Sequence, residues 1–291
     1  MKYARIDELR QQHPVAAMCR VLEVFFIFFF FWRKRRTWAR AQEERRPESE
    51  RKAAQQRTRE TYGPQRLQSD LADHGIPASV YRIKRIRRRL GLRCKQKRKF
   101  KATTNSSHAL PLAPNLLDRQ FAVATPNCTW VTDITYVATD EGWLYLAGIK
   151  DLFNGELVGY AMSDRMTTTL VSQALFRAVA AKRPAKGLIH HSDRGSQYCS
   201  HAYRKQLQQF GMQASMSRKG DCWDNAPMES FWGSLKNELV HHRRFATREQ
   251  ATREITESIE IFYNRIRKQA RLGYLSPAAF SQQYYAKKIA A

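Results

Sequence analysis

Residues 129–139, TWVTDITYVAT, are the part of this sequence that most limits how the chain can fold. The segment is rich in β-branched and aromatic residues, which predicts a β-strand. Because side chains alternate along a strand, Trp130 and Ile134 lie on one face and Val131 lies on the other. A strand that is apolar on both faces is typical of the middle of a sheet with helices packed on both sides.

The segments after this strand predict the elements that such a sheet needs. Two more strands are predicted at 142–153 and 156–163, joined by an Asn-Gly turn, which is a common hairpin signal. Further strands are predicted at 187–192 and 212–217, and helices at 167–182, 200–211, 226–240 and 247–268. Thr247 and Gln250 fit a capping box for the last helix. The order β-β-β-α-β-α-β-α predicts an α/β fold, with a mixed sheet and helices on its faces.

The net charge limits the partners of the chain. Its 291 residues include 51 lysines and arginines and 26 aspartates and glutamates, which gives a formal net charge of +25. A charge of this size and sign favours a polyanionic partner, and nucleic acid is the common one. A ribosomal protein or a merely basic surface is the alternative that the charge alone leaves open.

Cysteine usage and hydropathy both predict a cytoplasmic chain. The five cysteines are odd in number and form no C-x-x-C pair, which argues against a disulfide framework and a structural zinc site. The apolar run VFFIFFFFW at 24–32 is too short for a membrane span, which needs about 20 residues. Basic residues follow this run, whereas in a secretory signal they precede it. We therefore expect no membrane partner, and we expect the phenylalanines to form the core of a small helical unit over residues 1–45.

Residues 46–94 have the features of a small DNA-binding region. A first helix is predicted around Leu67 and Leu71, and a second helix begins after Ser79, a good N-cap. The apolar stripe of the second helix leaves several arginines on its other faces: Arg82, Arg85, Arg88 and Arg89. This pattern is typical of a helix-turn-helix that lies on DNA, although a solvated charged face has the same pattern. The basic and polar residues 95–127 then predict a linker.

Three acidic residues occupy positions that suit a metal site. Asp133 lies in the middle of the central strand, Asp193 at the end of the strand GLIHHS, and Glu229 in the first turns of the helix APMESFWGSLKNEL. Three carboxylates that converge repel one another, so a cation must neutralise them. Sites built only from carboxylates favour Mg²⁺ or Mn²⁺, and two such ions about 4 Å apart support in-line attack on a phosphodiester. Spacing alone does not establish convergence, because other acids such as Asp151 lie nearby.

The polar residues beside Asp193 suggest two other kinds of chemistry. His190 and His191 are adjacent on one strand and point to opposite faces, so they cannot easily bind one ion together. No catalytic triad is suggested around Ser192 and Ser196, so we do not expect nucleophilic catalysis by a serine. We expect the histidines to serve in packing or in contacts with DNA.

Three motifs carry a resemblance to a known family. They are WVTDITYV at 130–137, HSDRGSQY at 191–198 and DNAPMESFWGSLKNEL at 224–239. Through these motifs the chain resembles insertion-sequence transposases of the retroviral-integrase type, and in particular the OrfB-like product of the second reading frame in the two-frame family. The spacing of Asp193 and Glu229 matches that family. YGPQRL and RIKRIRRRLGL, in the region 46–94, resemble its helix-turn-helix region.

The resemblance implies a fold, an activity and a set of site residues. Residues 128–245 would form a ribonuclease-H-like catalytic core, and 246–291 a C-terminal helix and tail. The three acids would bind Mg²⁺ or Mn²⁺ and catalyse DNA cleavage and strand transfer at the ends of the element, with no covalent protein–DNA intermediate. Lys236 would contact DNA near the reacting end. Other residues of the motifs are candidates for the site or for DNA contact: Asn225, Gln197, Tyr198 and Trp232.

The resemblance also implies partners. A homo-oligomer would bind double-stranded DNA, both as element ends and as target, and the chain would be fused to the first-frame protein or act beside it at the nucleoid. In one departure from the family, Gln269 stands where a histidine is common, so any role of that imidazole is absent. Two other functions stay open, a metal nuclease of the same fold without strand transfer and an inactive DNA-binding remnant that regulates a fused transposase.

Overall fold

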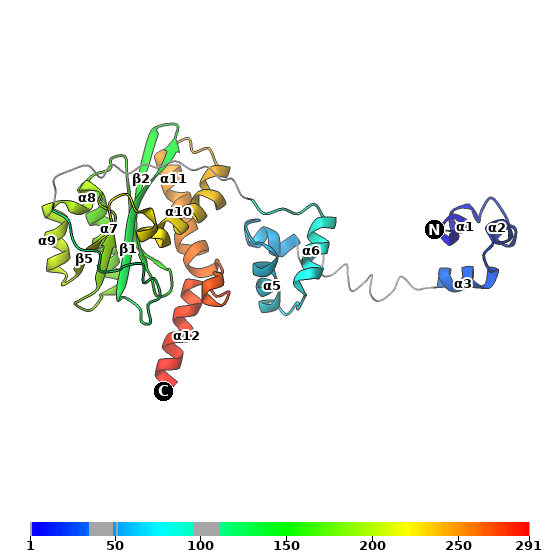
Figure 1. Cartoon of the computed structure of the whole chain (residues 1–291). Helices are drawn as coiled ribbons and strands as arrows, with labels where there is room; N and C mark the ends of the chain where they lie inside the picture. Colours follow the sequence, from blue (N-terminus) through cyan, green and yellow to red (C-terminus); the bar gives the residue numbers. More distant parts are fainter. Residues whose placement is uncertain (1, 35–48, 51, 96–110, 291) are drawn as a thin grey trace.

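A five-stranded mixed sheet lies at the centre of the C-terminal part of the chain (Figure 1). The computed structural model describes residues 2–34, 49–50, 52–95 and 111–290. The strands lie in the order β3-β2-β1-β4-β5, with bounds Thr129–Thr139 for β1, Gly142–Asp151 for β2, Leu157–Ser163 for β3, Ile189–Ser192 for β4 and Gln213–Met216 for β5. β2 pairs antiparallel with β1 and β3, and β4 pairs parallel with β1 and β5. β1 is therefore the central strand, as its sequence predicts.

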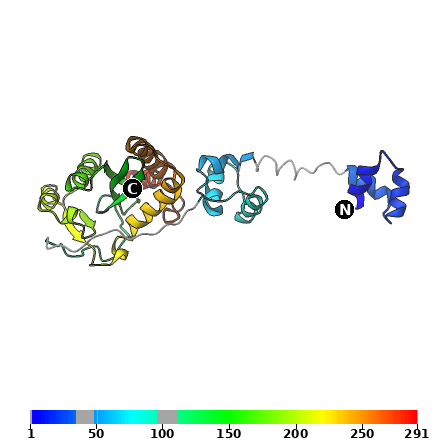
Figure 2. The same cartoon turned by 90° about the horizontal axis from the view of Figure 1, so that it is seen from above.

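Helices cover both faces of the sheet (Figure 2). One face packs against α7 (Thr168–Lys182), α8 (Ser196–Cys199) and α9 (His201–Gln209), and the other against α10 (Ala226–Glu238) and α11 (Arg248–Glu257). Short 3-10 turns, η1 (Cys222–Asn225) and η2 (Val240–His242), flank α10. Trp130 belongs to the first hydrophobic core and Val131 to the second. Both apolar faces of β1 are thus buried, which confirms the predicted α/β architecture.

The C-terminal segment differs from the single helix predicted over 247–268. α11 ends at Glu257, and the chain continues as a π-helix, η3 (Ser258–Ile266), a 3-10 turn, η4 (Ala270–Leu272), and α12 (Pro277–Ala290). The N-cap is where the sequence predicts it, since Thr247 Oγ1 accepts a hydrogen bond from the backbone N–H of Gln250 at 3.0 Å. Ile255 and Ile259 belong to the same core as Val131, so the predicted boundary at 245/246 lies inside one continuous hydrophobic core.

The phenylalanine run does not form a buried core, contrary to the prediction for residues 1–45. The described part of this unit contains α1 (Lys2–Leu9), α2 (Val15–Val21) and α3 (Phe26–Lys34). Phe29 is fully buried against Ile6 and Cys19, whereas Phe25 is 73% exposed and Phe31 is 63% exposed. A short helix that is apolar all round can bury only one stripe against two equally short helices, so its other side chains stay at the surface.

The apolar N-terminal helices are also too short to be membrane spans individually. Within the described residues, no single helix is long and apolar enough to cross a bilayer. Val15–Val21 and Phe26–Arg33 meet the criteria of length and composition only when they are counted together, across a bend of 115°.

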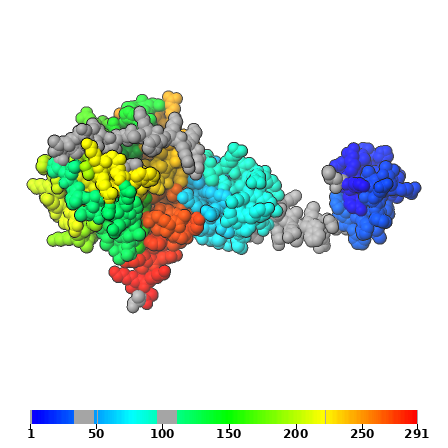
Figure 3. Space-filling view, viewed as in Figure 1, coloured from blue at the N-terminus to red at the C-terminus, as the bar shows by residue number. Residues whose placement is uncertain are grey.

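A second helical region packs on the C-terminal segment (Figure 3). It contains helical residues at 49–50 and 52–57, followed by α5 (Pro64–Asp73) and α6 (Val80–Arg89). Leu67 and Ile83 lie in its core, and Phe262 of η3 packs into the same core. Tyr62 Oη accepts a hydrogen bond from the backbone N–H of Lys268 at 2.7 Å. These contacts join the helical region to the segment that follows the sheet.

Lys150, on β2, is a buried cation whose titration affects stability. The residue is 5% exposed, and its Nζ donates a hydrogen bond to the carbonyl oxygen of Pro227 at 2.9 Å. Burial, followed by the charges of Arg271 and Arg267, lowers the pKa of Lys150 to about 7. Unfolded Lys150 has its ordinary pKa, so between the two values the unfolded state binds more protons than the folded state. The free energy of unfolding therefore rises with pH through this window.

Lys150→Met should remove this pH dependence. In phosphate-free buffer, the variant should be more stable than the wild type at pH 6, because it lacks the buried charge. Its advantage should shrink by roughly 2–4 kcal/mol by pH 10, where the wild-type amine is largely neutral in the folded state. Urea unfolding at several pH values measures the difference, and an advantage that stays constant across the range would show that Lys150 does not titrate as described.

Candidate active site

Asp133 is held in the middle of β1 by two hydrogen bonds. Its Oδ1 accepts from the backbone N–H of Ile134 at 2.8 Å, and its Oδ2 accepts from Trp232 Nε1 at 3.0 Å. Burial raises the pKa of Asp133 to about 8, and the negative charges of Asp193 and Glu229 contribute to the shift while the two hydrogen bonds oppose it. The three predicted acids therefore share one electrostatic environment, which we call the carboxylate site.

Asp193 reaches this site because β4 runs parallel to β1. Val131 pairs with His191 in the ladder, and Asp133 and Asp193 each lie two residues beyond this pair. Asp193 Oδ1 accepts a hydrogen bond from the backbone N–H of Gly195 at 2.9 Å. A Cβ at position 195 would lie 3.0 Å from the same oxygen, so glycine leaves the space that the carboxylate occupies.

Glu229 comes from the first turn of α10, which packs over the sheet. Trp232 lies three residues further along the helix, on the same side as Glu229, and contacts Asp133. Gly148 pairs with Asp133 across β1 and β2, and a Cβ there would lie 2.8 Å from the Trp232 ring, so this glycine allows the ring to pack. The Glu229 side chain is largely exposed, and its partial desolvation raises its pKa.

The carboxylate site is open. Within the part of the chain that the structure describes, no three histidine, cysteine, aspartate or glutamate side chains are close enough to hold one metal ion together. Like charges that share a region repel one another, which opposes closer approach of the three carboxylates and favours a proton on the most buried of them. The three acids therefore lie in one region of the structure, but their carboxylates are too far apart to bind a single ion.

Lys236 lies beside this site, on the same helix as Glu229. Its Nζ is 5.1 Å from the centre of the Tyr136 ring. Burial lowers the pKa of Lys236, and the negative charge of Asp133 opposes the shift. The ammonium group is therefore within electrostatic reach of the carboxylates, on a half-buried part of the surface.

Two residues predicted to face DNA are instead buried and bind a neighbouring strand. Tyr198 is 2% exposed and its Oη lies 3.2 Å from Thr132 Oγ1. Asn225 is 5% exposed and its Nδ2 donates to the carbonyl oxygen of Thr132 at 3.0 Å. Both side chains therefore fix the residue that precedes Asp133. Gln197 is half-buried, and its Nε2 donates to the carbonyl oxygen of Met166 at 3.2 Å.

The two adjacent histidines of β4 have separate structural partners. His190 Nε2 lies 3.2 Å from Tyr203 Oη on one side of the sheet. His191 contacts Ser215 Oγ at 2.8 Å and Ser217 Oγ at 3.1 Å on the other side. Burial lowers the pKa of His190 to about 3 and that of His191 to about 4, so both rings are neutral near pH 7. Of the two roles predicted for these histidines, packing and DNA contact, the structure shows packing.

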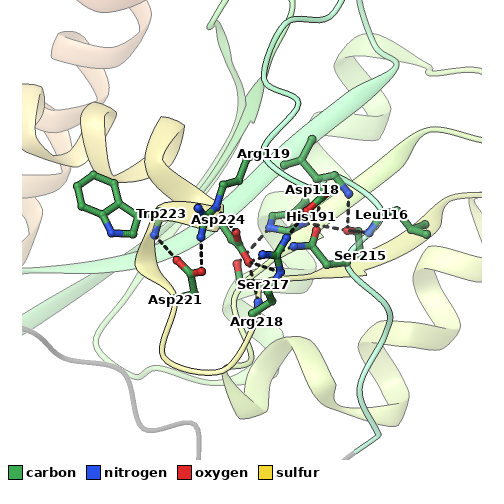
Figure 4. Close-up of polar contacts among 12 residues, drawn as sticks. Leu116, Asp118, Arg119, His191, Ser215, Ser217, Arg218, Asp221, Trp223 and Asp224 are labelled. Carbon is green, nitrogen blue, oxygen red and sulfur yellow. Dashed lines mark hydrogen bonds and ion pairs between the residues drawn. The ribbon is translucent and has the colours of Figure 1, made fainter.

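A buried ion-pair network, which sequence reasoning missed, fixes the loop that leads into α10 (Figure 4). Asp224 is fully buried and accepts hydrogen bonds from Asn115 Nδ2 at 3.0 Å, Arg119 Nε at 2.8 Å and the backbone N–H of Arg218 at 2.9 Å. Burial acts to raise the pKa of Asp224, but these hydrogen bonds and the two arginine charges outweigh it and lower the pKa. Asp224 lies in the motif DNAPMES, but two of its partners, Asn115 and Arg119, come from a segment predicted to be a linker.

The arginines of α6 divide between its two sides. Arg87 is 8% exposed and donates to Cys94 Sγ at 3.1 Å. Of the arginines predicted to face DNA, Arg82 is half-buried. The other three are exposed: Arg85, Arg88 and Arg89. The outer face of α6 is therefore basic, as its sequence predicts.

Comparisons with known proteins agree with this architecture. Models described as an integrase core domain match residues 124–222 and 229–285, and a model described as an HTH-like domain matches residues 42–100. Transposase InsF for insertion sequence IS3A of Escherichia coli (strain K12) is 40% identical over 97% of this chain and 99% of that protein. The insertion element IS600 uncharacterized 31 kDa protein of Shigella sonnei is 59% identical over 84% of this chain and 90% of that protein.

Among solved structures, the catalytic core domain of HTLV-2 integrase in complex with magnesium is 14% identical, with a TM-score of 0.43 over 53% of this chain and 96% of that chain. The family models and the InsF alignment together span the helical region, the sheet and the C-terminal segment. The resemblance seen in the sequence motifs is thereby confirmed. The chain belongs to the IS3-family transposases, with an HTH-like region followed by an integrase catalytic core of ribonuclease-H-like fold.

Proposed function

We propose that this chain catalyses metal-dependent cleavage of DNA phosphodiesters and strand transfer at the ends of its insertion sequence. The observation that carries the proposal is the shared environment of Asp133, Asp193 and Glu229. Burial raises the pKa of Asp133, and the charges of Asp193 and Glu229 add to the shift, which supports treating the three acids as one site. Perturbed carboxylates of this kind are typical of catalytic sites.

The donor set fits Mg²⁺ or Mn²⁺. Asp133, Asp193 and Glu229 offer only carboxylate oxygens, which hard divalent cations prefer. Burial is the main cause of the raised pKa of Asp133, and repulsion from Asp193 and Glu229 adds to it; a bound cation would favour the charged carboxylates against both effects. Bound ions of this type supply an activated water or 3′-hydroxyl nucleophile and stabilise the leaving oxygen.

The residues around the carboxylates serve to position them. Trp232 holds one oxygen of Asp133, which restricts the rotation of that carboxylate. Tyr198 and Asn225 bind Thr132 from two directions, so the backbone just before Asp133 cannot shift freely. A site fixed in this way keeps its ligands oriented before DNA arrives, which is the basis of preorganised catalysis.

Basic residues of two regions would hold the DNA. Lys236 lies near enough to the carboxylate site to meet a phosphate there, and Gln197 of the HSDRGSQY motif is partly accessible. The outer face of α6 would contact the terminal DNA through arginines: Arg82, Arg85, Arg88 and Arg89. Contacts of this kind to phosphates supply affinity and orientation.

We further propose that a homo-oligomer acts on double-stranded DNA, with the element ends and the target as substrates. The first-frame protein of the element would be fused to this chain or act beside it, and the site of action would be the nucleoid in the cytoplasm. The similarity to InsF and the net charge of +25 support a DNA substrate. The proposed boundaries of the N-terminal unit and the helix-turn-helix region are 1–45 and 46–94. A linker is proposed over 95–127, but its residues Ala113 and Leu117 pack into the hydrophobic cores of the sheet domain.

Labelled DNA with the inverted repeats that flank the gene tests the proposal. With Mg²⁺, the protein should give both nicked ends and products joined to a target duplex. Asp193→Asn should still bind the DNA and slow its migration in a gel. The yield of both products should fall roughly a thousandfold or more, because a carboxylate that would bind the metal becomes a neutral amide. Nicks on any DNA without joined products would identify a metal nuclease, and retardation without cutting would identify a DNA-binding remnant. Cleavage that persists in Asp193→Asn would overturn the metal-site assignment.

A further inference from the structure

A pocket of about 400 Å³ opens where the sheet, α10 and the C-terminal segment meet. Four of its lining side chains are cationic: Arg66 of α5, Lys150 of β2, and Arg267 and Arg271 after η3. We call it the basic pocket. Ser230 and Ser234 of α10 add hydroxyl groups to its wall.

The basic pocket has a buried floor and an open mouth. Lys150 is 5% exposed and Arg267 is 6% exposed, so water reaches these two cations poorly. Arg271 and Ser230 are exposed at the rim. An anion can therefore enter from solvent and meet charges in a region of lowered dielectric constant, where attraction is stronger than at an open surface.

One carboxylate neutralises part of this charge. Glu238 accepts two hydrogen bonds from Arg267, at 2.8 Å from Nε and 2.7 Å from Nη2. The same carboxylate lies 3.9 Å from Arg66 Nη1. Burial, followed by the charge of Arg267, lowers the pKa of Arg66, although Glu238 acts against the shift. The glutamate therefore only partly balances this pair of arginines.

The other two cations interact with carbonyl groups. Lys150 Nζ donates to the carbonyl oxygen of Pro227 at 2.9 Å, and Arg271 Nη1 donates to that of Leu152 at 3.2 Å. Neither forms an ion pair within 4 Å in the described ranges of the chain; Asp151 acts on Arg271 only as a more distant charge. Each retains further N–H donors, since an ammonium has three and a guanidinium five.

The basic pocket lies on the same face of the sheet as the carboxylate site. Asp133 pairs with Gly148 and Val131 pairs with Lys150, and directly paired residues of antiparallel strands share a face. Lys150 is therefore displaced from Asp133 by two residues along the strands, or roughly 7 Å. Ser230 on the rim directly follows Glu229 in the sequence. A single DNA strand can reach both sites.

We propose that the basic pocket binds a phosphate group, and that on DNA it holds a backbone phosphate adjacent to the one at the carboxylate site. A phosphate offers several acceptor oxygens, which suits the fork of Arg271, the ammonium of Lys150 and the hydroxyl of Ser230. Only the choice of DNA as the source of the phosphate rests on the proposed function. Binding of the group itself rests on the charges and the cavity.

Calorimetric titration of the full chain with inorganic phosphate tests whether the basic pocket binds phosphate. At pH 6, where the Lys150 amine is protonated, Lys150→Met and Arg271→Gln should each weaken phosphate binding roughly tenfold or more, because each removes a charged donor. The matched control is Arg244→Gln, an arginine with an 87% exposed side chain that pairs with Asp140 away from the pocket, and it should bind phosphate as the wild type does. Equal binding by the wild type and all three variants overturns the proposal. Arg271→Gln keeps the test decisive if Lys150→Met does not fold.

The salt dependence of DNA binding tests the source of the phosphate. Loss of one phosphate contact in Arg271→Gln should reduce the slope of log K against log salt by about 0.9, and Arg244→Gln should leave the slope unchanged. If Arg271→Gln weakens phosphate binding but leaves the slope unchanged, the pocket binds free phosphate and not a DNA phosphate. Asp193→Asn should bind inorganic phosphate normally, so a failure of strand transfer in the wild type would leave the pocket standing and remove only the proposed function.

Discussion

Asp133→Asn should abolish strand transfer and at the same time stabilise the fold. The variant loses a charged ligand of the proposed metal site, so joined products should fall by roughly a thousandfold, or about 4 kcal/mol of transition-state stabilisation. The gain in stability has a separate cause. The folded-state pKa of about 8 lies far above the ordinary value of 3.8, so the folded protein binds more protons between these values, and the free energy of unfolding falls as pH rises through them.

An asparagine has no charge to bury, so the variant should escape this loss. The amide can accept only one of the two N–H hydrogen bonds that the carboxylate accepts, which offsets part of the gain. At pH 8 in EDTA, urea unfolding should show Asp133→Asn to be more stable than the wild type by roughly 2–4 kcal/mol, and below pH 4 the variant should be the less stable of the two. Asp140→Asn is the matched control, since Asp140 is a surface acid paired with Arg244, and it should change neither quantity by much. A destabilised Asp133→Asn variant that still joins DNA ends would show that this aspartate is structural.

Asp224→Ala should have the largest effect on stability. The substitution removes the buried acceptor shared by Arg119 and the backbone N–H of Arg218. Both arginine side chains are about half exposed, so water can solvate their charges, and the cost comes from the lost hydrogen bonds, roughly 2–4 kcal/mol. The melting temperature should fall by roughly 5–10 °C. Strand transfer should fall too, because the loop before Glu229 loses its anchor.

Asp221→Asn provides the comparison for Asp224→Ala. Asp221 also pairs with Arg119, but its side chain is partly exposed, so the change should cost less than about 1 kcal/mol. The melting temperature of Asp224→Ala should therefore lie well below that of Asp221→Asn. Equal melting temperatures for Asp224→Ala and the wild type would mean that the network in Figure 4 does not hold the loop.

The sheet and its helices could be predicted because their signals are local. The double apolar face of β1, the periodic stripe of α10 and the N-caps at Ser79 and Thr247 are properties of short segments, and the structure has them where the sequence places them. The positions of the acids on β1, after β4 and on α10 also followed from these elements. Their shared role depended on the family motifs, because spacing alone cannot show that three distant carboxylates meet.

Other features could not be predicted because they depend on tertiary contacts. The π-helix η3 follows a segment with ordinary helical periodicity, and its Asn264 binds both the N–H and the carbonyl oxygen of Leu157 on β3, a partner far away in sequence. Tyr198 and Asn225 lie in motifs that suggest DNA contact, but whether a polar side chain points outward or binds a neighbouring strand is decided by packing.

The exposed phenylalanines and the basic pocket illustrate the same limit. An apolar run predicts burial, but the amount buried depends on the area of the elements available to cover it, and α1 and α2 are short. The pocket combines Arg66, Lys150 and Arg271, which come from three distant segments of the chain. No local pattern marks them as neighbours.

Iron-directed cleavage of the polypeptide can show whether Asp133, Asp193 and Glu229 bind one metal centre. Fe²⁺ in place of Mg²⁺, with ascorbate and peroxide, generates radicals that cut the backbone close to the bound metal. If the three carboxylates hold one metal centre, the wild type should be cut near Asp133, Asp193 and Glu229, excess Mg²⁺ should suppress all three cuts, and Asp193→Asn should lose them together. Cuts confined to other segments, or cuts that persist unchanged in Asp193→Asn, would contradict the account.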